Sequence, residues 1–180
     1  MIAVQYNKNV AVIQYLFATF KDVVDFRQQD NYGNTALMLA ARYSTNVEVI
    51  QYLYNTFKDT INIEVQDKDG YNALMIAVRY NTHIAVIQYL CDIYKGGFYT
   101  QDKDGNTALM IAAEYNTNVA VIQYLKVVFK DTKTINIQTK YNGETALMLA
   151  AQYNKNIKVF QALCEIFKDK IDINKQDKNS

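Results

Sequence analysis

One motif of the chain runs Asp102-Lys103-Asp104-Gly105-Asn106-Thr107-Ala108-Leu109-Met110-Ile111-Ala112-Ala113. Its Ala-Leu-Met core, followed by Leu or Ile, recurs at intervals of 37, 35 and 38 residues, beginning at Ala36, Ala73, Ala108 and Ala146. A glycine precedes each copy by three residues, and Val-Ile-Gln-Tyr-Leu follows each at a constant distance, degenerating in the last copy. A period in the mid-thirties indicates stacked supersecondary units rather than one closed domain.

The unit that begins at Gly105 predicts a pair of helices. Thr107 is a candidate N-cap for a helix over 108–115, because its hydroxyl can accept a backbone N–H of the first turn. Asn116 follows, at the position where a helix often ends in a left-handed residue. Asn118 can cap a second helix with a wide apolar stripe over 119–129. Each unit is therefore expected to be a helix, a tight turn, a longer helix and an extended finger with a glycine turn.

This pattern resembles the ankyrin repeat. The motif over 102–113 is similar to the family's Asp-x-x-Gly-x-Thr-Pro-Leu-His-x-Ala-Ala, and Ile173-Asn174-Lys175-Gln176-Asp177 is similar to its closing Val-Asn-x-x-Asp. Alanine replaces the proline and methionine replaces the histidine in every copy, so the threonine–histidine link typical of the family is lost. The resemblance implies an all-α, ankyrin-type helix-turn-helix solenoid of about five repeats, with extended β-turn fingers between them.

The repeat boundaries predict a single array over 1–180. Its units are 1–29 (incomplete), 30–66, 67–101, 102–139 and 140–176, and a further unit begins at 177–180. We expect the natural array to continue in both directions, or else to expose apolar ends that permit end-to-end self-association. The connection at Gly96-Gly97 is shorter than its counterparts. It is either a tolerated deletion, a bend or a docking spot, and the residues do not choose between them.

Composition excludes several classes of function. The chain has 180 residues, 50% of them hydrophobic, and a net charge of +1, which provides no basic field for nucleic acid or an anionic membrane. No segment is apolar for the length of a membrane span, and none has the pattern of a signal peptide, so we expect a cytoplasmic protein. With one histidine and two cysteines, Cys91 and Cys164, we expect no cofactor, no metal and no enzymatic activity.

Two local features have simpler interpretations than a functional site. The Asp-Lys-Asp-Gly turns at 67–70 and 102–105 begin like a calcium loop, but Ile76 and Ile111 stand where the loop requires glutamate. They are better interpreted as β-turns. His83 occupies a position held by asparagine in the other units, which favours a substitute helix cap.

Tyrosines form two ladders along the repeats. The first, Tyr15, Tyr52, Tyr89 and Tyr124, is expected in the core stripe of the second helices, stacked between neighbours. The second, Tyr6, Tyr43, Tyr80, Tyr115 and Tyr153, ends the first helices. In arrays of the resembled family this position borders the concave groove. Packing between repeats is the favoured interpretation of the second ladder, and a row of interface contacts is the alternative.

Comparison of the internal copies separates two kinds of position. Positions that are constant are those that every unit needs for stacking, whereas variable positions face solvent or a partner. By resemblance, the variable positions near the finger turns and the groove are those that grip other proteins; ordinary solvated surface is the alternative. The candidate partner-binding residues are Tyr32, Asn34, Arg42, Tyr43, Lys68, Asp69, Tyr71, Arg79, Tyr80, Lys103, Asp104, Asn106, Glu114, Tyr115, Tyr141, Glu144, Gln152 and Tyr153.

The sequence thus predicts a non-catalytic protein–protein interaction module that binds a protein partner through the concave groove and the finger turns. The alternative is a structural spacer or scaffold segment of a larger multi-repeat protein without a dedicated partner. The near identity of the units favours this alternative, because a surface selected for one partner should diverge more. The sequence contains no phosphate-binding loop, no Ser/His/Asp set and no metal-ligand spacing that would favour an enzyme.

Overall fold

The computed structural model describes residues 2–20, 25, 28–59, 61–94, 97–129, 135–168 and 175–178. Within these ranges the regular secondary structure is helical, and no strand is assigned. The chain divides into two compact units, residues 1–94 (unit 1) and 95–180 (unit 2).

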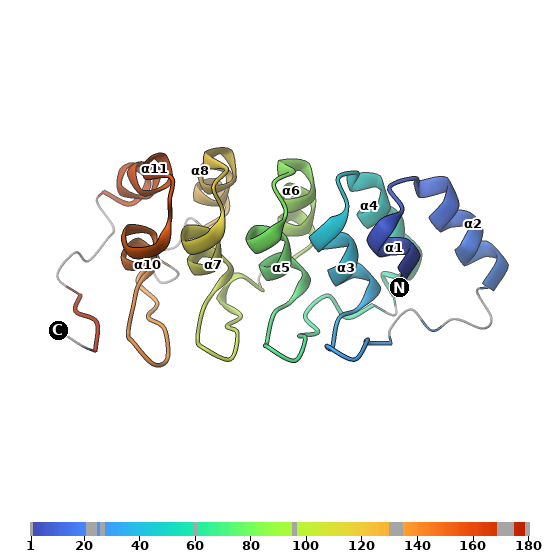
Figure 1. Ribbon diagram of the computed structural model, residues 1–180, viewed down its shortest axis with the longest axis horizontal. Helices are drawn as coiled ribbons and strands as arrows, with labels where there is room; N and C mark the ends of the chain where they lie inside the picture. Colours follow the sequence, from blue (N-terminus) through green and yellow to red (C-terminus); the bar gives the residue numbers. More distant parts are fainter. Residues whose placement is uncertain are drawn as a thin grey trace. The chain divides into compact units, whose positions relative to one another are not determined.

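Unit 1 consists of three helix pairs, whose bounds are α1 (Ile2–Tyr6), α2 (Val10–Phe20), α3 (Ala36–Tyr43), α4 (Val47–Phe57), α5 (Ala73–Tyr80) and α6 (Ile84–Ile93). Helix α3 packs against both α1 and α5, and α4 packs against both α2 and α6. The first helices of the pairs therefore form one layer and the second helices another, as the blue-to-green part of Figure 1 shows.

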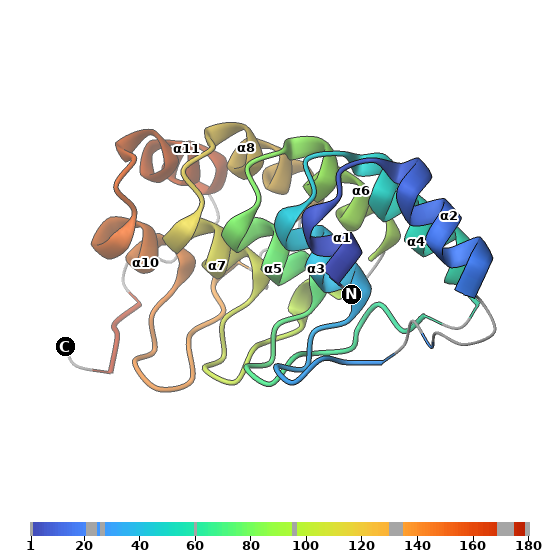
Figure 2. The same cartoon turned by 45° about the vertical axis from the view of Figure 1, so that its right-hand side comes forward.

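Unit 2 repeats this arrangement with a short 3-10 helix, η1 (Gly97–Tyr99), followed by α7 (Ala108–Tyr115), α8 (Val119–Val128), α10 (Ala146–Tyr153) and α11 (Ile157–Phe167). Helix α10 packs on α7, and α11 packs on α8. In each unit the described residues that precede a first helix, 28–35 and 61–72 in unit 1 and 100–107 and 135–145 in unit 2, include long loops, which are visible below the helices in Figure 2. These loops are the predicted fingers, and the all-α repeat fold is confirmed.

The predicted caps begin most of these helices. Thr35, Thr107 and Thr145 each accept a hydrogen bond from the backbone N–H three residues on, and Asn72 does so in the remaining copy. Among the second helices, Asn118 accepts from Ala120 N, as predicted. His83 occupies the N-cap position of α6 but makes no side-chain cap bond.

The predicted left-handed residue at the end of the first helix is wrong. Asn116 has φ −81° and ψ 122°, which is extended backbone, and in the described residues positive φ occurs at glycines alone. At the equivalent positions the side chain makes a contact between repeats instead. In unit 1, the Asn81 side chain donates to the carbonyl oxygens of Ala41 (2.9 Å) and Ser44 (2.8 Å) of the preceding pair. Its Oδ1 accepts from His83 N, so one side chain supports both sides of the turn.

In unit 2 the same bridge recurs. Asn154 donates to the carbonyl oxygens of Ala113 (2.7 Å) and Asn116 (3.1 Å), and its Oδ1 accepts from Asn156 N. Hydrogen bonds to carbonyls at a helix end satisfy acceptors that have no partner within the helix. The asparagine at this position is therefore a link between repeats rather than a turn residue.

The core consists of the Ala-Leu-Met segments and the Val-Ile pairs of the second helices, nearly all of which are fully buried. The first tyrosine ladder only partly follows its prediction. Tyr52 packs edge-on to Phe17, with ring centroids 5.7 Å apart, and Tyr89 packs in the same manner on Tyr54 at 6.3 Å. Tyr15 was expected in the core and is 70% exposed, because Ile13 and Phe17 form the buried face of α2.

The two cysteines are free thiols: Cys91 is buried and Cys164 is partly buried. Burial raises the pKa of the Cys91 thiol to about 12, and the negative charge of Asp92 raises it further. Lys95 and Gly96 of the shortened connection lie outside the described residues, as do Ile173 and Asn174. Within the described part of the chain, no helix is long and apolar enough to cross a membrane.

Candidate functional site

The finger turns are built around an aspartate and a glycine. Asp30 Oδ1 accepts hydrogen bonds from Tyr32 N (2.9 Å) and Asn34 N (2.8 Å), and Gly33 completes the turn with φ +88°. Burial acts to raise the pKa of Asp30, but the hydrogen bonds from Asn34, Tyr32 and Gly33 hold it below its ordinary value. Asp67 and Asp102 close their turns in the same way. The interpretation of these aspartates as β-turn residues is thus supported by their contacts.

Adjacent fingers within a unit are joined backbone to backbone. In unit 1, Lys68 N donates to Tyr32 O at 3.0 Å. In unit 2, Lys140 N donates to Asp104 O at 2.8 Å and Lys178 N to Asn142 O at 2.7 Å. These bonds fix the spacing of the tips and so place equivalent side chains of adjacent repeats next to one another.

A hollow of about 480 Å³ lies between the fingers and the first helices of unit 1, which we call the unit 1 groove. Its lining includes many of the predicted partner-binding residues, namely Tyr32, Asn34, Arg42, Tyr43, Lys68, Asp69, Tyr71 and Tyr80. Arg79 is the predicted residue of this unit that does not line it. The sequence interpretation did not select five other lining residues: Gln5, Asp30, Leu39, Asp67 and Ile76. Leu39 and Ile76 were missed because the constant fourth position of the Ala-Leu-Met motif looks like pure core.

Arginines and tyrosines interleave in and beside the unit 1 groove. The Arg42 guanidinium lies over the Tyr80 ring, 3.9 Å from its centroid, and 5.2 Å from that of Tyr43. Arg79 lies 5.3 Å from the centroids of both Tyr71 and Tyr80, and it donates a hydrogen bond to the Tyr71 hydroxyl. Such cation–π contacts hold the guanidinium planes in place. The second tyrosine ladder therefore both packs and remains accessible: Tyr43 is 39% exposed and Tyr80 44%.

A smaller hollow of about 230 Å³, the unit 2 groove, occupies the equivalent place in unit 2. The predicted residues that line it are Asp104, Asn106, Glu114, Tyr115, Tyr141, Glu144 and Tyr153. Lys103 and Gln152 are exposed but do not line it. Glu144 was predicted as a finger-tip contact, yet it is 7% exposed and accepts a hydrogen bond from Asn142. In this finger Thr139 replaces the turn aspartate, and its Oγ1 accepts a hydrogen bond from Glu144 N.

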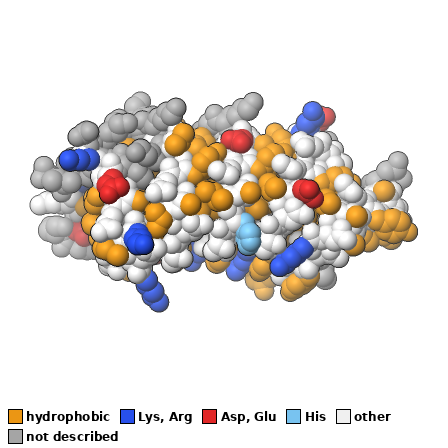
Figure 3. Space-filling model, turned by 90° about the horizontal axis from the view of Figure 1, so that it is seen from above, with side chains coloured by type: hydrophobic (Ala, Val, Ile, Leu, Met, Phe, Trp, Pro, Cys, Tyr) orange, Lys and Arg blue, Asp and Glu red, His pale blue; other side chains and the backbone are white. Residues whose placement is uncertain are grey.

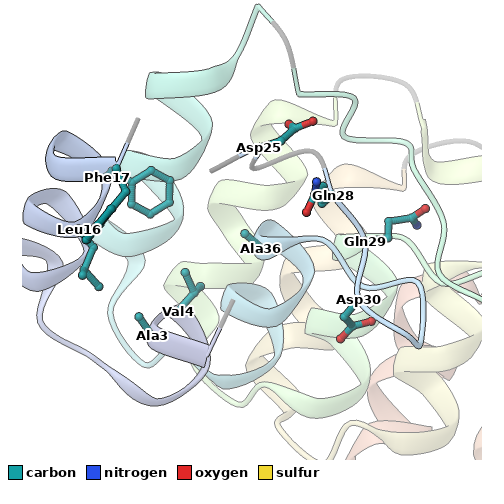
Figure 4. Close-up of a pocket in the computed structure, with 10 residues that line it drawn as sticks. Ala3, Val4, Leu16, Phe17, Asp25, Gln28, Gln29, Asp30 and Ala36 are labelled. Carbon is teal, nitrogen blue, oxygen red and sulfur yellow. The ribbon is translucent and has the colours of Figure 1, made fainter. Parts of the chain in front are cut away.

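A second hollow in unit 1, of about 490 Å³, has a mostly apolar lining that the sequence did not predict. Figure 4 shows Ala3 and Val4 of α1 and Leu16 and Phe17 of α2 on one side, with Asp25, Gln28, Gln29, Asp30 and Ala36 across from them. Phe20 completes the lining. Asp30 is its only residue that also lines the unit 1 groove, and none of the predicted partner-binding residues belongs to it.

The face drawn in Figure 3 carries few charges. Lysine, arginine and acidic side chains are spread over it, and the pale blue histidine is exposed on it. His83 is exposed, and its Nδ1 lies 3.3 Å from Asn81 Oδ1. Its observed contacts are those of a residue in the turn between paired helices.

Comparison with known proteins agrees with the geometry. The family model described as ankyrin repeats (3 copies) matches residues 1–97 and again residues 93–177, which together span nearly the whole chain. No curated protein matches the sequence. Repeated capped helix pairs, glycine-turn fingers and two matches to the repeat model lead to one conclusion: the chain belongs to the ankyrin-repeat family.

Proposed function

We propose that this chain binds a protein partner through the unit 1 and unit 2 grooves and their finger tips, without catalysing a reaction. Ankyrin repeats are generally protein–protein interaction modules, and the family is generally non-catalytic. The observation that carries the proposal is that the residues that vary between repeats are largely the residues that line the grooves. Most residues that vary between the internal copies also line a groove, and the sequence variation and the groove geometry are independent properties.

The chemistry of the groove linings suits recognition. Tyrosine and arginine are the residue types that most often carry the binding energy of interfaces, and here they stand on the ends of packed helices. Because cation–π contacts and helix packing already hold Arg42 and Tyr80, a partner would meet a preformed surface. Binding to such a surface orders few side chains, and less binding free energy is lost to ordering.

The test is affinity capture from a native lysate of the source organism with three baits. The groove variant carries Tyr32→Ser, Arg42→Glu and Tyr80→Ser, all of which line the unit 1 groove. The control variant carries Tyr15→Ser, Glu48→Arg and Tyr99→Ser, which are exposed and line neither groove. Both variants must first match the wild type in circular dichroism and thermal melting.

We expect at least one protein to be retained by the wild type and the control and lost by the groove variant. Identical protein sets on all three baits would contradict groove recognition. That result would favour the spacer or scaffold role, which the near identity of the repeats supports.

A further inference from the structure

Arg42 and Arg79 hold equivalent positions in successive repeats of unit 1, yet their surroundings differ. The Arg79 guanidinium donates to the Tyr71 hydroxyl. Among the residues that the structure describes, Arg42 contacts the faces of Tyr43 and Tyr80 and has no hydrogen bond or ion pair. The two residues therefore have the same charge and equivalent positions, but among these residues Arg79 has a polar partner and Arg42 has none.

The nitrogens of Arg42 are open to the groove. Within the described residues, no buried side-chain nitrogen or oxygen lacks a hydrogen-bond partner. Because Arg42 is only partly exposed and makes no hydrogen bond, its guanidinium nitrogens must be accessible to solvent. Stacking on Tyr80 occupies a face of the guanidinium and leaves its N–H edge available. A fixed guanidinium with a free edge suits two parallel hydrogen bonds to a carboxylate.

Three aspartates, Asp30, Asp67 and Asp69, line the unit 1 groove together with Arg42. Asp30 and Asp67 belong to the finger turns, and their Oδ1 atoms accept backbone N–H groups of those turns. Asp69 is at a finger tip and exposed. Arg42 is in the last turn of α3, six residues beyond the first residue of the helix, which is about 9 Å along the axis. The equivalent position one repeat earlier is the neutral Gln5, which also lines the groove.

We propose that Arg42 is the specificity-determining residue of the unit 1 groove and that it binds a side-chain carboxylate of an acidic peptide segment. The proposal rests on the proposed function, and it infers the partner's chemistry from the Arg42 guanidinium alone, since the lining also carries three aspartates. The partner's Glu or Asp would supply the hydrogen bonds that Arg42 lacks, while the tyrosines on either side contact the neighbouring part of the peptide.

The experiment is selection of random 12-residue peptides displayed on phage against the immobilised 180-residue chain, in parallel with Arg42→Gln and Lys8→Gln. The Lys8→Gln variant is the matched control, because it removes the same charge from an exposed position of unit 1 that lines neither groove. Both variants must retain wild-type circular dichroism and melting. We expect peptides selected by the wild type and by Lys8→Gln to be enriched in Asp and Glu over the starting library, and those selected by Arg42→Gln not to be.

A double-mutant cycle then tests the contact directly. The best peptide is synthesised with each Asp or Glu and with the corresponding Asn or Gln, and its Kd is measured by fluorescence anisotropy. We expect one acid-to-amide change to weaken binding at least about tenfold for the wild type and for Lys8→Gln, but less than about twofold for Arg42→Gln. An Arg42→Lys variant should bind with intermediate affinity, because lysine retains the charge but not the planar fork.

Two other outcomes overturn the inference. Equal losses for the wild type and Arg42→Gln would show that Arg42 does not bind the carboxylate. Enrichment of peptides without an acidic bias, or of no peptide, would reject an acidic segment as the ligand. The proposed function is tested separately by the lysate capture. Retention of a protein by the wild type, and its loss from the groove variant, do not depend on which peptides the phage selection yields.

Discussion

Single residues replace an interaction that the ankyrin family usually makes. Threonine and methionine form a reciprocal cap in three repeats: the threonine Oγ1 accepts from the methionine N–H, and the methionine Sδ accepts from the threonine N–H at 3.3–3.4 Å. Sulfur is a weak acceptor. The threonine hydroxyl therefore supplies most of the stabilisation, and the methionine contributes chiefly through its buried volume.

The first prediction concerns this cap. Thr107 is fully buried, and its replacement by alanine leaves Met110 N without an acceptor, so we expect Thr107→Ala to lower the free energy of unfolding by about 1–2 kcal/mol. Thr107→Asn should cost clearly less, because Asn72 already caps the equivalent position, with 2.9 Å to Met75 N. Urea unfolding followed by circular dichroism measures both. A Thr107→Asn loss as large as that of alanine would contradict the capping argument.

Local residue chemistry explains how much the sequence could predict. The helix over Ala108–Tyr115 was predicted to the residue, because its N-cap and the spacing of its apolar residues are local features of the sequence. Asn116 was predicted wrongly, because the carbonyls that the equivalent Asn81 binds are 40 and 37 residues away. Leu39 was missed as a groove residue because a constant apolar position carries no sign that one edge faces a hollow.

At the level of elements, the finger turns depend on close approach between repeats. Gly33 and Gly105 have positive φ, and a Cβ added to either would lie within 2.7 Å of a backbone nitrogen of the next finger. Glycine is thus required at these positions for two reasons: it adopts the positive φ, and it leaves room for the backbone of the next finger. Gly143 also has positive φ, but its nearest neighbour would be the flexible Lys178 side chain at 3.1 Å.

The second prediction uses this difference within unit 2. Gly105→Ala and Gly143→Ala both force alanine into the left-handed region, at a cost of about 1–2 kcal/mol each. Gly105→Ala should cost more, because its Cβ would come within 2.6 Å of Lys140 N and displace the bond from that nitrogen to Asp104 O. Urea midpoints give the stabilities, and hydrogen exchange at Lys140 N reports the bond. Equal losses, with Lys140 still protected, would show that contact between fingers adds nothing.

At the level of the whole molecule, packing and surface variation fall on different positions of the repeat. Constant residues bury the Ala-Leu-Met segments and link helix ends, while variable residues gather at the fingers and grooves. In a repeat protein each helix pair is stabilised by its neighbours rather than by a common core. Substitutions at the surface can therefore accumulate without weakening the core. A substitution that weakens the core of one helix pair should destabilise that pair and its neighbours, and not the distant pairs.

The third prediction tests that locality with a matched pair of substitutions. Leu53 of α4 in unit 1 and Leu163 of α11 in unit 2 are both at most 1% exposed. Truncation of either to alanine should cost about 2–5 kcal/mol through lost burial and the cavity left behind. Hydrogen exchange should show Leu53→Ala reducing protection mainly in α3–α6, with α10 and α11 largely unaffected, and Leu163→Ala doing the reverse. Uniform loss across both units in either variant would mean that the array unfolds as one cooperative body, and the nearest-neighbour account of its stability would be wrong.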